Sequence, residues 1–444
     1  MSITNDHFKV GLLTPYSGGN LGDGAIQDAV IWNIRKRIQN VVIYGITLYP
    51  EDTKRRHDVL TFPLCGYCNR HYVLFNSETT EGIDGRSNLN EGSWKKVKRK
   101  IKEHRLAYLL LKHLYGKVRM MIQEVTHIVG AYNLAKELNL IVVSGGGQLD
   151  EYWGGPWGHP YVLFKWAMFA KMTKCRFIML SVGKSSLDSM LSRFFVKWAL
   201  KLSAYRSYRD EVSKKLLNEY AFTTGDPVFP DLVFSLPIPS VFRCSTAEKG
   251  TTLVGVSPIA YCDPRVWPRQ EPLVYESYVR KLASFISWLT RNNYKVLLFS
   301  TDEPDRETIN DLLSKLAQDQ KPYVMENLLC PPSSSVNELL SCLSRVDFVV
   351  ASRLHGVKIS HMLSKPTLAI SYERKVSTYM SEVGLEDYCL DIDDFDLDSI
   401  TAGFTRLLRD KEKITLKVKN KADEYEKSLE KQYENIFAVF CIAR

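Results

Sequence analysis

The stretch KVGLLTPYSGGNLGDGAIQDAVIWNI, residues 9–34, decides the fold of this 444-residue chain. Its first six residues, Lys9–Thr14, form a short apolar run that predicts a buried strand. A glycine-rich turn follows, and from Gly22 to Ile38 apolar residues recur every three or four positions, which predicts a helix. A strand, a glycine turn and a helix in this order are typical of the first unit of a parallel sheet.

The same alternation continues through the first half of the chain. Val41–Tyr44, Leu140–Ser144 and Phe177–Ser181 are further strand-like runs, and the last two run into glycine. Repetition of this unit predicts a doubly wound parallel sheet. We assign residues 1–235 to an N-terminal Rossmann-like lobe.

A second alternating set begins near Thr252. Its strand-like runs and helix-like runs alternate as in the first half, and the proline-containing stretch Pro227–Ser245 joins the two sets. We therefore predict an α/β fold with two Rossmann-like lobes, similar to GT-B, with a cleft where the carboxyl ends of their strands face each other. The C-terminal lobe spans residues 246–410. The charged helix within 411–444 is expected, by analogy, to pack back on the first lobe.

Composition is that of a globular protein, with 45% hydrophobic and 25% charged residues. No apolar run approaches the roughly 18 residues that a membrane-spanning helix needs. The N-terminus shows no secretory pattern, so we expect a cytoplasmic location. Lysine and arginine number 59 against 50 acidic residues, a net charge of +9 that favours acidic partners: phosphorylated small molecules, anionic lipid or nucleic acid.

The nine cysteines are scattered through a long chain, which indicates a reducing compartment rather than a disulfide framework. Cys65 and Cys68 form one C-x-x-C motif with His71 nearby, and no second pair follows at zinc spacing. We therefore predict a pair of thiols without a metal, and no metal site elsewhere.

A polar segment and a basic segment interrupt the first lobe at about 77–119. Residues 77–93 read as an exposed loop. Trp94–Arg119 then combines many lysines and arginines with apolar residues at helical spacing. This stretch has two interpretations: a helix on an anionic membrane surface, or the solvated face of a long surface helix.

Two glycine clusters sit where strands end in the first lobe. Gly18–Gly24 opens the first helix, and there Asp23 is either the helix cap or a base toward a substrate hydroxyl. Ser144–Gln148 predicts a turn at the cleft edge, and the segment after it carries Trp153 and Trp157. These indoles either stack on sugar rings or form a packed aromatic turn.

Charged side chains follow strands of the second lobe in the same way. Arg353 offers a rigid fork for a carboxylate or phosphate, and His355 offers a proton near neutral pH. Both lie where a strand leads into a helix, the favoured position for an anionic ligand. Downstream, Glu373 and Lys375 follow another strand, and Arg209 would lie near the cleft from the first lobe.

Taken together, these segments resemble the polysaccharide pyruvyltransferase family. The resemblance runs from roughly residue 8 to 380, and the insertion and the tail after Leu385 fall outside it. It implies phosphoenolpyruvate as donor and a sugar of a polysaccharide, or its lipid-linked precursor, as acceptor. It implies no cofactor. The matching blocks, in the family's order, are Gly19–Asp23, Gly145–Gly147, Ser207–Asp210, Asp226–Asp231, Ser352–Gly356, and Tyr372 with Lys375.

The resemblance implies roles on the donor side. Arg209, Arg353 and the backbone around Leu354 would hold the phosphate and carboxylate of phosphoenolpyruvate. His355 would be the general acid that protonates the methylene carbon. Lys375 would neutralise charge on the departing phosphate.

On the acceptor side, Asn20, Gln148 and Trp153 are expected to hold sugar hydroxyls. Asp23 or Glu373 would deprotonate one of them. The two hydroxyls would then close a cyclic pyruvate ketal.

Two other functions are compatible with the residues alone. One is a nucleotide-sugar glycosyltransferase of the same two-lobed shape, which would bind a sugar nucleotide. The other is a basic, non-enzymatic protein that docks on a membrane or another polyanion through 94–119. We expect no nucleic-acid partner, because few stacking aromatic residues are interleaved with the basic ones. If the enzyme meets a membrane, we expect a peripheral contact at the inner face.

Overall fold

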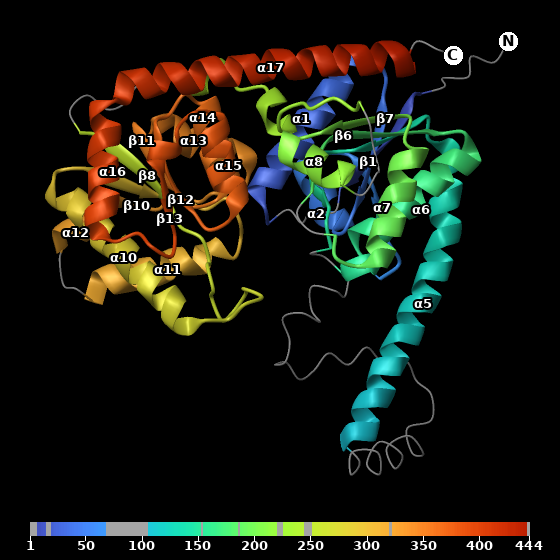
Figure 1. Cartoon of the computed structure of the whole chain (residues 1–444), viewed down its shortest axis with the longest axis horizontal. Helices are drawn as coiled ribbons and strands as arrows, with labels where there is room; N and C mark the ends of the chain where they lie inside the picture. Colours follow the sequence, from blue (N-terminus) through green and yellow to red (C-terminus); the bar gives the residue numbers. More distant parts are fainter. Residues whose placement is uncertain are drawn as a thin grey trace.

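The computed structural model describes residues 7–14, 19–67, 105–151, 154–184, 187–219, 225–243, 251–318 and 322–441. They form two α/β lobes, and the long helix α17 (Lys411–Cys441) runs across both of them (Figure 1). Each lobe is a parallel sheet with helices on its faces. The predicted fold class is therefore confirmed.

The N-terminal lobe is built on a seven-stranded parallel sheet in the order β3-β2-β1-β4-β6-β5, with β7 also paired to β6. The first strand lies where the sequence predicts it. The strands are β1 (Lys9–Thr14), β2 (Val42–Thr47), β3 (Leu60–Pro63), β4 (Leu140–Val143), β5 (Gly146–Leu149), β6 (Arg176–Lys184) and β7 (Tyr205–Tyr208). The helices are α1 (Leu21–Arg37), α2 (Pro50–His57), α5 (Arg105–Glu137), η1 (Gly155–Trp157), α6 (His159–Thr173), α7 (Met190–Leu202), α8 (Glu211–Asn218), η2 (Leu232–Ser235) and α9 (Ser240–Arg243).

The C-terminal lobe has a six-stranded parallel sheet in the order β10-β9-β8-β11-β12-β13. Its strands are β8 (Leu253–Ser257), β9 (Lys295–Leu298), β10 (Leu328–Leu329), β11 (Phe348–Ala351), β12 (Thr367–Ser371) and β13 (Cys389–Asp391). Its helices are α10 (Pro272–Arg291), α11 (Asp305–Gln318), α12 (Pro322–Glu326), α13 (Val336–Arg345), α14 (Leu354–Met362), α15 (Arg374–Glu382), η3 (Glu386–Tyr388) and α16 (Leu397–Arg409).

One predicted turn is a strand. The residues after Ser144 were expected to turn at the cleft edge, but Gly146–Leu149 pairs with β6 as β5. The turn is confined to Gly145 and Gly146, whose φ angles of 74° and 73° are the left-handed values that glycine tolerates best. The chain therefore re-enters the sheet instead of ending at its edge.

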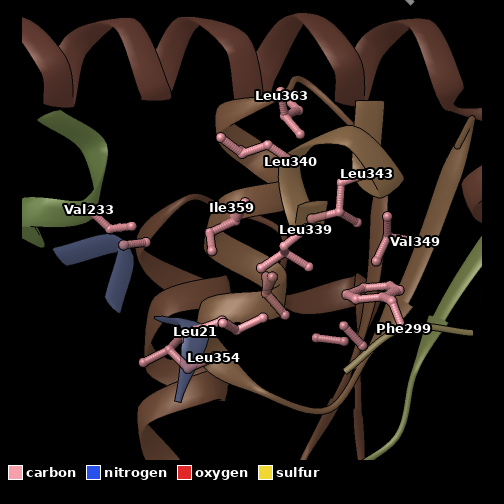
Figure 2. Packing of buried hydrophobic residues seen from close by; sticks show 14 of the residues in the cluster. Leu21, Val233, Phe299, Leu339, Leu340, Leu343, Val349, Leu354, Ile359 and Leu363 are labelled. Carbon is pink, nitrogen blue, oxygen red and sulfur yellow. The ribbon is translucent and has the colours of Figure 1, made fainter. Parts of the chain in front are cut away.

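The lobes share a continuous apolar core at the place where α1 and α14 begin. Figure 2 shows Leu21, at the start of α1, beside Leu354, at the start of α14, with Val233 of η2 close by. Burial of each of these leucines stabilises the contact by about 1.5–3 kcal/mol. The two helix starts are thereby held against each other.

Backbone hydrogen bonds join the lobes at the same place. The Leu21 amide donates to the Thr301 carbonyl at 2.8 Å, and the Glu303 amide donates to the Gly19 carbonyl at 2.9 Å. Asn20 and Asp302 form an isolated β-bridge. The glycine turn of the first lobe is therefore fixed to the second lobe by main-chain contacts.

Helix α17 also connects the lobes. Glu430 on this helix pairs with Arg37 at 2.6 Å, and Gln432 donates to Ser207 at 2.5 Å. Near its end, Arg176 of β6 donates to the Phe440 carbonyl at 2.6 Å. Within the described ranges, no helix is long and apolar enough to cross a bilayer.

The cysteine prediction needs correction at one position. Cys65 is buried and disulfide-bonded, so it is not the thiol that the sequence suggested. Cys68 and His71 lie outside the described residues. The described cysteines that are free thiols are Cys175, Cys262, Cys330, Cys342 and Cys389.

Candidate active site

The start of α1 places Asp23 toward the second lobe. Asn20 is the N-cap, and its side-chain oxygen accepts a hydrogen bond from the Asp23 amide at 3.0 Å. The alternative that Asp23 itself caps the helix is therefore wrong. Its carboxylate instead faces the imidazole of His355.

His355 lies at the start of α14, directly over the α1 backbone. Its Nδ1 is 3.9 Å from Oδ1 of Asp23, and both side chains are 15% exposed. A Cβ added to Gly22 would lie 2.2 Å from this Nδ1, so only glycine permits the approach. At Gly24, two residues further along the helix, an added Cβ would meet nothing closer than the Val336 side chain at 3.7 Å.

Asp231 lies on the other side of the imidazole. This residue caps η2 through the Val233 amide, and its side chain is 1% exposed. Its Oδ2 is 2.8 Å from Nζ of Lys358 and 3.8 Å from Nε2 of His355. Nε2 is buried, and the described residues offer it no hydrogen-bond partner. The imidazole therefore stands between two carboxylates at distances longer than hydrogen bonds.

Burial alone would raise the pKa of Asp231, but the neighbouring Lys358, His355 and Arg209 hold it well below its usual value. Asp231 is thus a buried anion shared by groups from both lobes. Sequence reasoning placed Asp231 in the matching block Asp226–Asp231 without a role, and it did not single out Lys358. Their partners come from distant segments, and no local spacing connects them.

Arg209 brings a cation from the first lobe. It follows β7, and its Nη1 is 3.7 Å from Oδ2 of Asp231. The guanidinium rests on Gly183 of β6, where an added Cβ would lie 2.6 Å from Nη2. The absence of a side chain at Gly183 therefore lets Arg209 approach the backbone, just as Gly22 lets His355 approach it.

The pKa of Asp23 is raised from its ordinary value. Burial is the largest cause, and Asp231 adds to it, while His355, Lys375 and Arg209 act in the opposite direction. A carboxylate with a raised pKa is a stronger base than one in water. Asp23 therefore has the chemistry needed to accept a proton from a hydroxyl.

The guanidinium of Arg353 is already paired with carboxylates of the chain. Its Nε and Nη2 each donate to Asp305 at 2.8 Å, and Nη2 is 3.2 Å from Asp302. The carboxylate that this guanidinium holds belongs to the chain itself. Burial raises the pKa of Asp302 to about 7 despite the nearby Arg353.

Glu373 and Lys375 form a more exposed rim at the start of α15. Their side chains pair at 2.7 Å and are 42% and 39% exposed. Lys375 also lies 5.6 Å from the ring centroid of Tyr372. Lys375 acts to lower the pKa of Asp23.

The remaining predicted residues have different surroundings. Gln148 is buried, and its amide nitrogen donates to the Gly145 carbonyl at 2.8 Å, so it stabilises the turn before β5. Trp153 lies outside the described residues. Trp157 is exposed and packs its ring against Tyr161 and Phe195. Leu354 has a buried side chain, and it is the first residue of α14.

A separate cavity of about 710 Å³ opens between the lobes along another face of α1. It is lined by Trp32 and Arg35 of α1, by Arg55 and Arg56 of α2, and by the start of α13. Leu21 and Gly24 also line it, but His355, Asp23 and Arg209 do not. The cluster around His355 is therefore distinct from this cavity.

The fold defines the class first. Two parallel-sheet lobes with helices on their faces form a GT-B-like fold, and glycosyltransferases and epimerases of known structure have a similar fold. A match to the family model described as polysaccharide pyruvyl transferase covers residues 20–374. The chain belongs to this family.

Solved structures similar to this chain agree on the fold. A glycosyltransferase from Rickettsia africae has a TM-score of 0.53 at 9% identity, with 99% of this chain and 100% of that chain covered. The UDP-GlcNAc 2-epimerase from Neisseria meningitidis has a TM-score of 0.52 at 12% identity, with 96% and 100% covered. That from Methanocaldococcus jannaschii has a TM-score of 0.52 at 10% identity, with 90% and 92% covered.

Proposed function

We propose that this protein transfers pyruvate from phosphoenolpyruvate to two hydroxyls of one sugar, in a polysaccharide or its lipid-linked precursor, and releases phosphate. Membership of the pyruvyl transferase family supports the transferred group and the kind of acceptor. The observation that carries the mechanism is the imidazole of His355 between Asp23 and Asp231, beside cations from both lobes. An acid, a base and cationic groups are what this reaction needs.

The donor is a small anion with a carboxylate and a phosphate, and the site offers positive groups to hold it. Arg209 and Lys375 approach from opposite lobes, and both act on the pKa of Asp23. The Leu354 amide at the start of α14 adds a hydrogen-bond donor at the positive end of a helix. Because Nε and Nη2 of Arg353 face Asp305, we assign only its Nη1 to the donor.

The reaction begins with protonation of the methylene carbon by His355. The central carbon then becomes electrophilic, and an acceptor hydroxyl adds to it as Asp23 takes the hydroxyl proton. A second hydroxyl displaces the phosphate, whose departing charge Lys375 and Arg209 offset, and its proton leaves with the phosphate. The methylene becomes a methyl group, and the two sugar oxygens close the ketal. General acid action contributes about two to four powers of ten in rate.

The acceptor enters on the Asn20 side in this scheme. Asn20 is held by its capping bond and by its bridge to Asp302, which places it beside Asp23. Gln148 leaves the acceptor set because its amide is occupied in a buried turn. Trp153 keeps its proposed contact with the sugar, and Glu373 is the second choice as base because its side chain is exposed.

The test is incubation with phosphoenolpyruvate and a panel of glycosides and lipid-linked saccharides. We expect phosphate release that depends on the acceptor, and a product heavier by one pyruvyl ketal. The His355→Ala variant serves as the inactive control. Turnover that requires a sugar nucleotide, with none from phosphoenolpyruvate, would instead identify a nucleotide-sugar glycosyltransferase.

The proposed location follows from the proposed substrates. A lipid-linked acceptor would lie at the inner face of the membrane, and we propose that the enzyme meets it there from the cytoplasm.

A further inference from the structure

The outer face of α7 carries an exposed apolar stripe. Met190, Phe194 and Trp198 follow one another at intervals of four residues, so they lie on one face of the helix. They are 84%, 49% and 41% exposed, and Leu191 beside them is 38% exposed. Large apolar side chains are rarely grouped in this way on a face that meets only water.

A basic stripe runs along the same helix. Arg193, Lys197 and Lys201 repeat the interval of four residues and form the neighbouring row. The two rows touch, because Nζ of Lys201 lies 5.4 Å from the ring centroid of Trp198. No acidic residue occurs between Met190 and Leu202, and the nearest one before the helix is Asp188.

The apolar stripe continues onto neighbouring elements. The ring of Phe194 packs against Phe164 of α6 at 6.1 Å, and the exposed Trp157 of η1 packs against Phe195 at 5.7 Å. Helices α6 and α7 lie side by side on the N-terminal lobe, away from the C-terminal lobe (Figure 1). We call the surface formed by Trp157, Met190, Leu191, Phe194 and Trp198, with the three basic residues of α7, the α7 face.

The geometry points to an anionic lipid bilayer as the partner of the α7 face. Tryptophan, phenylalanine and methionine insert at the boundary between headgroups and acyl chains, while lysine and arginine beside them bind the headgroups. A second copy of the chain fits less well, because two such faces would bring their basic stripes together. The proposal concerns binding alone and stands whether or not pyruvyl transfer is confirmed.

The position of the α7 face relative to the candidate site suits a membrane-bound acceptor. Helix α7 begins in the loop after β6, the strand whose Gly183 supports Arg209. Its N-cap Ser189 is tied by its amide to Glu151, in the loop after β5, at 2.9 Å. A bilayer under α7 would therefore lie close to the edge of the lobe that carries the site.

Helix α5 offers the main competing surface. Its exposed apolar residues recur at alternating intervals of three and four, a spacing that suits packing against another helix. Between Tyr115 and Val129, the described side chains include one basic residue, Arg119. The residues of this stripe are Tyr115, Val118, Ile122, Val125 and Val129, and Met121 beside them is also exposed.

The test is sedimentation of the full chain with vesicles of phosphatidylcholine alone or mixed with phosphatidylglycerol. We expect binding to the mixed vesicles only, and weakening of that binding by salt. Lys197→Glu with Lys201→Glu should lower the partition coefficient by more than about 30-fold, since loss of each cation at an anionic surface costs about fivefold and the new carboxylates are repelled as well. Met190→Glu with Phe194→Glu should abolish binding.

Controls on the C-terminal lobe carry the same charge changes on exposed residues. Lys413→Glu with Lys419→Glu, and Leu273→Glu with Leu416→Glu, should bind like the unaltered protein. Thermal melts show whether each variant is folded. Wild-type binding by the folded α7 variants would overturn the proposal.

Two further outcomes would also overturn it. If Val118→Glu with Ile122→Glu abolishes binding and the α7 variants retain it, the membrane contact is α5. If the unaltered chain binds neither kind of vesicle and sediments as a dimer, while the α7 variants sediment as monomers, the α7 face is an interface between two copies.

Discussion

Two buried clusters of charge in this molecule differ in how completely they are bonded. The first, which we call the anchor cluster, joins Lys165 of α6 to Glu124 of α5 at 2.6 Å. Lys165 also donates to the Leu64 carbonyl at 3.2 Å, and Glu124 accepts from the Gly66 amide at 2.7 Å and from Tyr161 at 3.0 Å. The anchor cluster thus ties the chain after β3 to two helices.

The second, the site cluster, consists of Asp23, His355, Asp231 and Arg209. Its contacts to His355 and Arg209 measure 3.7–3.9 Å, and Nε2 of His355 has no hydrogen-bond partner among the described residues. Asp231 of this cluster is bonded to Lys358 at 2.8 Å, whereas the buried Nε2 of His355 is unbonded, and an unbonded buried polar atom favours a binding or catalytic role. We propose that the anchor cluster stabilises the fold and that the site cluster binds a ligand.

The largest effect should follow from loss of the imidazole. In His355→Ala we expect the rate of phosphate release to fall by about two to four powers of ten, because the general acid is removed. The melting temperature should change little, since Nε2 of His355 makes no hydrogen bond within the described structure. A variant with normal turnover would remove His355 from the mechanism.

The anchor cluster should respond in the opposite way. Glu124→Ala leaves Lys165 buried without its partner, which should lower the free energy of unfolding by about 3–5 kcal/mol. Urea unfolding measures this loss, and the rate per folded molecule should be unchanged. A stable but inactive variant would contradict the division between the two clusters.

The pH dependence of stability follows from the same residue. Burial alone would raise the pKa of Glu124, but Lys165 and the Gly66 amide bring it below its ordinary value. A carboxyl group whose pKa is lowered by folding stabilises the fold at any pH above its unfolded-state pKa. This stabilisation is lost as the pH falls through the lowered, folded-state pKa. Glu124→Gln should therefore flatten the acid side of the stability profile.

Asp23→Asn should reduce the rate by about 10²-fold, the lower end for loss of a base. Since the pKa of Asp23 is raised, the rate of the unaltered enzyme should increase with pH through that raised value. The variant should lose this limb of the pH–rate profile. Glu373→Gln is the matched control, and it should keep both the rate and the limb because Glu373 is exposed. If Glu373→Gln alone abolishes the rise of the rate with pH, the base is Glu373 and not Asp23.

The finest test displaces His355 without removing it. Alanine at Gly22 would overlap the imidazole, and a displacement of about 1 Å can cost up to about 10²-fold in rate. Gly24→Ala, two residues along the same helix, meets nothing closer than 3.7 Å and should leave the rate unchanged. Equal rates in both variants would show that the approach of His355 to Gly22 is unimportant.

The sequence predicted the parts of the site that local patterns carry. A glycine turn after β1 predicts Asn20 and Asp23 at the start of α1, and the short link after β11 predicts Arg353 and His355 at the start of α14. The structure has them there. The sequence alone could not tell whether Asp23 caps α1 or serves as a base. The hydrogen bond from the Asp23 amide to the Asn20 side chain shows that Asn20 is the cap.

The rest depends on burial and on partners distant in sequence. Lys358 reads as an ordinary lysine on a helix, and only tertiary packing shows that it is buried against Asp231. Asp302 and Asp305, which pair with Arg353, lie in the loop before α11 and at the first residue of that helix, some 50 residues earlier in the chain. Neither contact follows from a spacing in the sequence. The motif Arg353-x-His355 alone therefore did not show that the Arg353 guanidinium is already paired with carboxylates of the chain.

The central claim is that His355 protonates the methylene carbon of phosphoenolpyruvate. The most direct measurement is mass spectrometry of the product formed in deuterated water. The account predicts one deuterium in the new methyl group of each ketal made by the unaltered enzyme, and a rate of product formation lower by about two to four powers of ten in His355→Ala. A ketal without solvent deuterium, or a deuterated ketal formed at the normal rate by His355→Ala, would contradict it.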